Sequence, residues 1–132
     1  MLRVDKIILA ILAIEHLGFG IYGFYSPEGI AELTGYALNS EFAYSEIRAY
    51  YTLISGLGLM AFLAIIIHKL ARQTYILFSF MFGCIFVGRL ANYLLTGQMD
   101  NSIMIAMIAE ALVIVLSLWR LASSKNRTVA EV

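Results

Sequence analysis

Residues 103–121 read IMIAMIAEALVIVLSLWRL, and this segment indicates what kind of protein the chain is. A helix of about 20 mostly apolar residues can cross the roughly 30 Å hydrocarbon core of a bilayer. Three more segments of similar length and composition lie at residues 7–25, 49–67 and 74–95. The sequence therefore predicts an all-α, integral membrane four-helix bundle. We expect residues 1–122 to form this single domain and residues 123–132 to be a flexible tail.

The composition of the chain supports a membrane protein and excludes several other classes. Hydrophobic residues make up 61% of the 132 residues and charged residues 14%, whereas soluble domains have about 45–50% and about 25%. Together with a mean hydropathy of +0.85, these fractions exclude a disordered chain, a nucleic-acid-binding module and an ordinary soluble enzyme. The nine basic and nine acidic residues cancel, so no nucleic acid is expected as a partner. The lipid bilayer is the predicted partner.

The basic residues gather at one end of the predicted spans. Seven of the nine lie there: Arg3, Lys6, Lys69, Arg72, Arg120, Lys125 and Arg127. The opposite ends carry acidic residues: Glu28, Glu32, Glu41 and Asp100. Because Lys and Arg concentrate in cytoplasmic loops, we expect both termini, and with them the tail, to be cytoplasmic.

The loop between the first two spans has the start and stop signals of a short helix. Ser26 precedes Pro27 and Glu28, the order of an N-cap, a first-turn proline and an acid near the positive end of the helix dipole. Gly35 suits the end of such a helix. We therefore expect a short helix over residues 27–34 at the membrane interface. It serves either as a plain link between two spans or as the lid of a pocket.

Two charged residues in the last two spans are predicted to form an ion pair. A charged side chain at the centre of a span costs roughly 2.5–3.5 kcal/mol on insertion, so it is expected to have a partner. Arg89 lies seven residues before Thr96, about 10 Å along a helix, and Glu110 lies eight residues after Ser102, about 12 Å. The connection between these spans is short, so they are antiparallel neighbours. We therefore predict that Arg89 and Glu110 meet, with bidentate geometry available to the guanidinium.

Further polar residues are predicted to lie in the outer half of the bundle. Glu15 and His16 interrupt the first span, and Arg48 precedes the second. Tyr51 and Asn92 each lie one helical turn from an arginine. We predict that these residues form one polar cluster with the ion pair. The candidate ligand-binding residues are Arg48, Arg89, Glu110, Asn92, Tyr51, Glu15 and His16.

Three functional hypotheses follow from this cluster. In the first, it lines a pocket, open to the outer leaflet, that binds a lipophilic small molecule with a polar or anionic head. If the protein is an enzyme, Glu110 or Glu15 is the candidate general acid or base, because a buried carboxyl group can hold a proton near neutral pH. In the second, the buried charges only fix helix packing in a structural or accessory subunit. In the third, the acids and His16 move protons or ions.

The sequence indicates no metal or cofactor site. The only other histidine besides His16 is His68, at the inner end of the second span. Glu15 and His16 diverge by about 100° around a helix, so they cannot point equally into one spot. The single cysteine, Cys84, can form neither an internal disulfide nor a cysteine-based zinc site. We therefore predict no metal ligands and no cofactors.

Small residues in the spans predict close helix packing. Gly18, Gly20 and Gly23 have the spacing of a dinucleotide-binding loop, but they lie inside an apolar helix with no preceding strand. They favour close packing or a flexible outer end of the first span. Three pairs of small residues four positions apart also favour helix contacts within the chain, with a dimer face as the alternative. These pairs are Thr52 with Gly56, Ser79 with Gly83, and Ser102 with Ala106.

Several short motifs together resemble a known family. They are Glu46-Ile47-Arg48-Ala49, Gly56-Leu57-Gly58, Gly88-Arg89 and Glu110. With them, residues 7–121 resemble the small bacterial four-span family catalogued as domain of unknown function four-three-four-five, and are loosely similar to DoxX-like membrane proteins. The resemblance implies a four-helix bundle in a bacterial inner membrane and implies no reaction. It favours Arg48, Arg89 and Glu110 as site residues, and it leaves open a homo-oligomer or a larger membrane complex.

Overall fold

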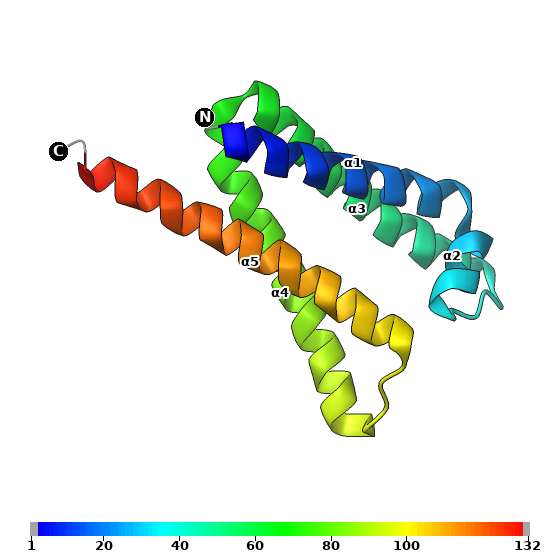
Figure 1. The fold of residues 1–132 in the computed structure, drawn as a ribbon. Coiled ribbons are helices and arrows are strands. Elements are labelled where there is room, and N and C mark those ends of the chain that lie inside the picture. Colours follow the sequence, from blue (N-terminus) through cyan, green and yellow to red (C-terminus); the bar gives the residue numbers. More distant parts are fainter. Residues whose placement is uncertain (1–2, 131–132) are drawn as a thin grey trace. The chain divides into compact units, whose positions relative to one another are not determined.

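The structure is a computed structural model that describes residues 3–130, with side chains described as far as residue 123. All regular elements in this part of the chain are helical (Figure 1). They are α1 (Arg3–Tyr25), α2 (Pro27–Thr34), α3 (Glu41–Ile66), the 3-10 turn η1 (His68–Leu70), α4 (Ala71–Thr96) and α5 (Asn101–Ala130). The prediction of an all-α fold is confirmed.

Among the described residues, four helical segments are long and apolar enough to cross a membrane. They are Arg3–Tyr25, Glu41–Ile66, His68–Thr96 and Asn101–Ser123. Each contains one of the predicted apolar segments, except that the second ends one residue early, and all four begin earlier than predicted, because a helix continues into polar flanking residues. The backbone of α5 stays helical to Ala130, through most of the segment predicted to be a tail.

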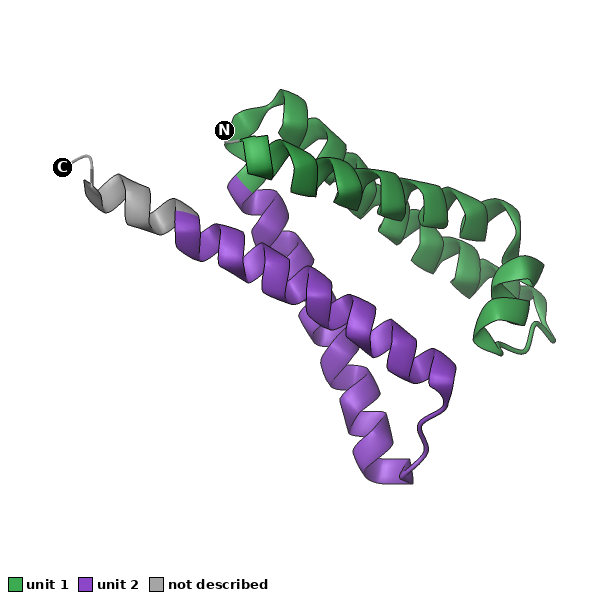
Figure 2. Cartoon of the chain, viewed as in Figure 1, with its two compact units in different colours: residues 1–71 green, residues 72–132 purple. Residues whose placement is uncertain are grey.

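The chain divides into two compact units, Met1–Ala71 and Arg72–Val132 (Figure 2). The first unit contains α1, α2, α3 and η1, and the second contains almost all of α4 and all of α5. Each unit thus contains two of the long helices, and every candidate site residue belongs to one unit or the other.

The first unit is held together by a close backbone approach between α1 and α3. A Cβ atom added at Gly20 of α1 would lie 2.5 Å from the backbone nitrogen of Ser55. One added at Gly58 of α3 would lie 2.5 Å from the backbone nitrogen of Leu17. Real Cβ atoms essentially never come within 3.0 Å of such atoms, so only glycine fits at both positions. Small interfacial residues of this kind let membrane helices pack backbone to backbone.

The glycine-based predictions are confirmed only in part. Gly20 and Gly23 do lie in close contact, Gly23 against the ring of Tyr51, whereas a Cβ at Gly18 would meet no described atom within 4 Å. The same test finds open space at Gly56 and Gly83. Neither glycine therefore makes a close helix contact within its own unit, and the packing expected of the two small-residue pairs stays a prediction.

The predicted short helix over residues 27–34 is present as α2. Ser26 is its N-cap residue and Pro27 lies in its first turn, although the Ser26 hydroxyl accepts no capping hydrogen bond. Gly35 ends the helix with a φ of 76°, a left-handed conformation that favours glycine. Ile30 of α2 is fully buried in a cluster with Ile47 and Tyr51 of α3, so α2 is anchored by packing.

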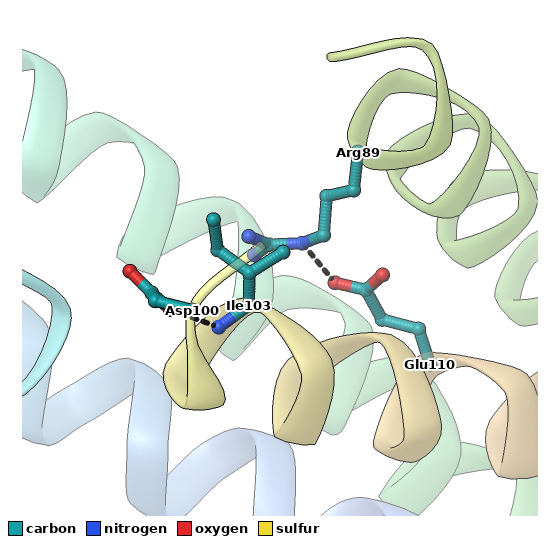
Figure 3. A network of polar contacts seen from close by, with 4 residues as sticks. All are labelled: Arg89, Asp100, Ile103 and Glu110. Atoms are coloured by element: carbon teal, nitrogen blue, oxygen red, sulfur yellow. Dashed lines mark hydrogen bonds and ion pairs between the residues drawn. The ribbon is translucent and has the colours of Figure 1, made fainter. Parts of the chain in front are cut away.

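In the second unit, a short connection of residues 97–100 joins α4 to α5. Gly97 adopts a φ of 67°, and its N–H donates to the Tyr93 carbonyl over 2.8 Å, which closes the end of α4. The Asp100 carboxylate accepts a hydrogen bond of 2.8 Å from the N–H of Ile103 (Figure 3). This is an N-cap contact that starts α5. Gly97 thus ends α4, and Asp100 caps the start of α5.

Candidate functional site

Arg89 of α4 and Glu110 of α5 point toward one another in the second unit (Figure 3). The Nε–H of Arg89 donates to Oε1 of Glu110 over 2.8 Å. The contact expected from the depths of these residues in their helices is therefore present. Opposite charges on the two arms of a helical hairpin make a neutral pair, which is the form in which charge is least costly in an apolar environment.

The two partners differ in how far they are exposed. The Glu110 side chain is 7% exposed, whereas 32% of the Arg89 side chain is exposed. Within residues 3–123, the guanidinium of Arg89 forms one hydrogen bond, the one from Nε to Glu110. The remaining N–H groups of this half-buried side chain can therefore act as donors to a molecule that approaches the pair.

The ion pair leaves one oxygen of Glu110 without a partner. The Oε2 atom is buried and has no hydrogen-bond partner among the described residues. An arginine and a carboxylate often form two parallel hydrogen bonds, which would satisfy both oxygens, but this pair forms one. A buried acceptor without a donor costs about 1–3 kcal/mol, and more when the group is charged. The site is therefore polar, buried and incompletely satisfied.

The first unit holds Arg48 and Tyr51 on α3. The side chain of Arg48 is exposed, and its guanidinium carbon lies 5.7 Å from the centroid of the Tyr44 ring, a cation–π contact. Tyr51 is buried, and its ring meets that of Phe19 edge to face at a centroid distance of 5.4 Å. Tyr51 thus contributes to the contact between α1 and α3, and Arg48 is accessible from outside the unit.

Glu15 and His16 lie on different faces of α1. The Glu15 side chain is 57% exposed, whereas His16 is buried. The Nδ1 of His16 lies 2.8 Å from the Leu12 carbonyl oxygen, and because a carbonyl only accepts, this nitrogen carries the proton. The two side chains therefore differ in burial, although Nδ1 of His16 also lies 4.0 Å from Oε2 of Glu15. Within the described residues, no group of three His, Cys, Asp or Glu side chains could hold a metal ion.

The comparisons with known proteins give a family. The model of the family described as "Domain of unknown function (DUF4345)" matches residues 4–121. The chain belongs to this family. No curated protein and no solved structure matches the chain. The DUF4345 region spans both units and contains every candidate site residue.

For the seven candidate residues in this DUF4345 protein, the structure gives the ion pair of Arg89 with Glu110 at 2.8 Å and a longer contact of 4.0 Å between His16 Nδ1 and Glu15 Oε2. Asn92 lies on α4 one turn after Arg89 and is exposed. The other four residues, Arg48, Tyr51, Glu15 and His16, belong to the first unit. That all seven form one cluster stays a prediction.

Three buried polar residues of the DUF4345 chain are not singled out by its sequence: Thr74, Ser117 and Arg120. Ser117 is fully buried and its hydroxyl has no partner among the described residues, and Arg120 is 6% exposed. The sequence predicts only that Arg120 flanks the last span on the cytoplasmic side, and in the structure its guanidinium carbon lies 5.1 Å from the centroid of the Trp119 ring. The available signal was the spacing, since Ser117 follows Glu110 by seven residues, two turns along one face of a helix.

Proposed function

We propose that this protein binds a lipophilic small molecule through a polar or anionic head that contacts Arg89 and Glu110. The observation that supports this proposal is the buried, unpartnered Oε2 of Glu110 next to the partly exposed side chain of Arg89. Lipid acyl chains supply no hydrogen bonds, so a molecule with a polar head is the natural source of the missing partner. Charged residues inside membrane spans are functional candidates for the same reason.

The proposal includes an orientation. With both termini in the cytoplasm of a bacterial inner membrane, the connection at residues 97–100 faces outward. Arg89 and Glu110 then lie about 10 Å below the outer surface, at the rise of 1.5 Å per helical residue. A lipophile resident in the outer leaflet can place its head at this depth while its chain stays among the lipids.

Native mass spectrometry of the protein purified with its co-extracted lipids tests this function. We expect the wild type to retain a lipophile, and the Arg89→Ala variant to lose it while remaining folded by circular dichroism. Arg72→Ala is the matched control, because Arg72 is an exposed arginine at the opposite end of α4. A wild type and variants that are all folded and all free of bound lipophile would contradict the proposal.

A structural role is the second candidate, and the ion pair between neighbouring helices is the observation that favours it. A pair that only fixes helix packing predicts that Arg89→Ala misfolds, because it leaves a buried carboxylate without a countercharge. It also predicts that adding Glu110→Ala restores folding. A binding site predicts instead that Arg89→Ala folds and loses its lipophile. The yield of monodisperse protein from the single and double variants separates the two functions.

A further inference from the structure

Building on this proposed function, we infer that the head of the bound lipophile is uncharged and carries a hydrogen-bond donor, with a hydroxyl group as the simplest case. The head donates to Oε2 of Glu110 and accepts from a free N–H of Arg89. This deepens the proposal above, which left the head polar or anionic.

The hydrogen-bond inventory of the pair leads to this chemistry. Ionised Glu110 is an acceptor only, and its Oε2 is the buried atom that lacks a partner among the described side chains. A group that satisfies it must donate. Arg89 has no acceptor at all, and its N–H groups beyond Nε need one. A hydroxyl both donates and accepts, so a single such group can bridge the second oxygen of Glu110 and the second edge of Arg89.

The charge of the pair leads to the same class of head. Arg89 and Glu110 bond each other over 2.8 Å and together are neutral. An anionic head on Arg89 would lie beside the Glu110 carboxylate and leave an excess negative charge in a medium of low dielectric constant. A cationic head would repel Arg89. An uncharged donor leaves the pair neutral and supplies the hydrogen bond it lacks.

Three probes with the same hydrocarbon chain test the inference on the wild-type protein. Oleyl alcohol has a hydroxyl donor, oleyl methyl ether has an acceptor without a donor, and oleate is an anion. Titration in detergent, followed by native mass spectrometry, gives the apparent affinity of each probe. We expect oleyl alcohol to bind about tenfold or more tightly than the ether, because a hydrogen bond to a charged group contributes about 1.5–3 kcal/mol, and more tightly than oleate.

The Glu110→Gln variant should reverse this preference. The amide keeps the size of the side chain and removes its charge, so Arg89 is left as an unpaired cation and oleate should bind more tightly than the alcohol. Glu32→Gln is the matched control, because it removes an exposed carboxylate from α2 and should keep the wild-type order. If Glu110→Gln does not fold, infrared difference spectra of the wild type give a second measurement. The alcohol should shift a carboxylate stretching band, and the ether should not.

The outcomes separate the two proposals. Equal binding of alcohol and ether, or tightest binding of oleate to the wild type, overturns the uncharged-donor inference and leaves lipophile binding in place. No binding of any probe to folded protein, together with no co-purified lipophile, overturns both. Equal, weak binding of all three probes would mean that only water satisfies Oε2, which also overturns the inference.

Discussion

Glu110 and Ser117 have the two buried polar side-chain atoms that lack a hydrogen-bond partner among the described residues. Together with Val113 and Arg120, they make up the buried side chains of α5 as far as residue 123, at successive spacings of three, four and three residues. This spacing places them on one helical face. The face that α5 buries is therefore mostly polar, although most of its other residues are apolar. The two unpartnered atoms are about 10 Å apart along the helix axis, so they pose separate chemical questions.

We expect the unpartnered hydroxyl of Ser117 to affect the stability of the protein. The Ser117→Ala substitution removes an unsatisfied hydroxyl and introduces a stronger helix former, so we expect the free energy of unfolding to stay constant or rise by up to about 1 kcal/mol. Thermal unfolding in detergent measures the change. Ser79→Ala is the control, because the Ser79 hydroxyl donates to the Ile76 carbonyl over 2.9 Å. A fall of several degrees in Tm for Ser117→Ala alone would mean that this hydroxyl has a partner in the folded protein.

At the scale of the helices, the contact between α1 and α3 depends on the absence of side chains. Gly20 and Gly58 each approach backbone atoms of the opposite helix at distances that no Cβ tolerates. Gly56, two residues before Gly58 on the same helix, faces open space. Because two residues correspond to a rotation of about 200°, these glycines lie on opposite sides of α3. Substituting Gly56 or Gly58 therefore compares the same change on two opposite faces of α3.

We expect Gly58→Ala to destabilise the protein by about 1–3 kcal/mol, because the added methyl group meets the backbone of Leu17 and forces the helices apart. Gly56→Ala should be neutral or stabilising by up to about 1 kcal/mol, since alanine favours the helix and meets no atom. Unfolding of both variants in mixed micelles tests the difference. Equal stabilities would show that α1 and α3 do not approach as closely as described.

The positions of the helices along the chain were predictable, and their rotations were not. Length and hydropathy located all four spans, and the proline and glycine signals located α2. The contact between Arg89 and Glu110 was predictable because the depth of each residue in its span follows from the number of residues to the end of the helix. Distinguishing Gly58 from Gly56 requires the rotation of α3 about its axis. In a soluble helix polar residues mark the outer face, but around Gly56 and Gly58 both the buried and the exposed sides of α3 are apolar, so that signal is missing there.

At the scale of the whole molecule, the distribution of charge predicts how the chain crosses the membrane. Basic residues flank the spans at one end, whereas Asp100, which caps α5, lies in a connection without lysine or arginine. Four spans with this asymmetry favour an even topology in which the N- and C-termini share the cytoplasmic side. The proposed binding of an outer-leaflet lipophile depends on this orientation.

Reporter fusions test the topology. A fluorescent protein that matures only in the cytoplasm should be dark when fused after Asp100 and bright when fused to the C-terminus. Alkaline phosphatase, which is active only outside the cytoplasm, should give the opposite pattern at the same two positions. A bright fluorescent fusion after Asp100 would reverse the orientation and place the Arg89–Glu110 pair near the inner leaflet.

The glycine contacts between α1 and α3 lie entirely within Met1–Ala71. All the atoms contacted at Gly20, Gly23 and Gly58 belong to residues of α1 and α3. The ribosome has therefore added every residue of these contacts by the time α3 is complete. This helical hairpin can therefore enter the bilayer and close while α4 and α5 are still being translated. A substitution at Gly58 should then expose the nascent chain to membrane quality-control proteases earlier than a substitution in α5 does.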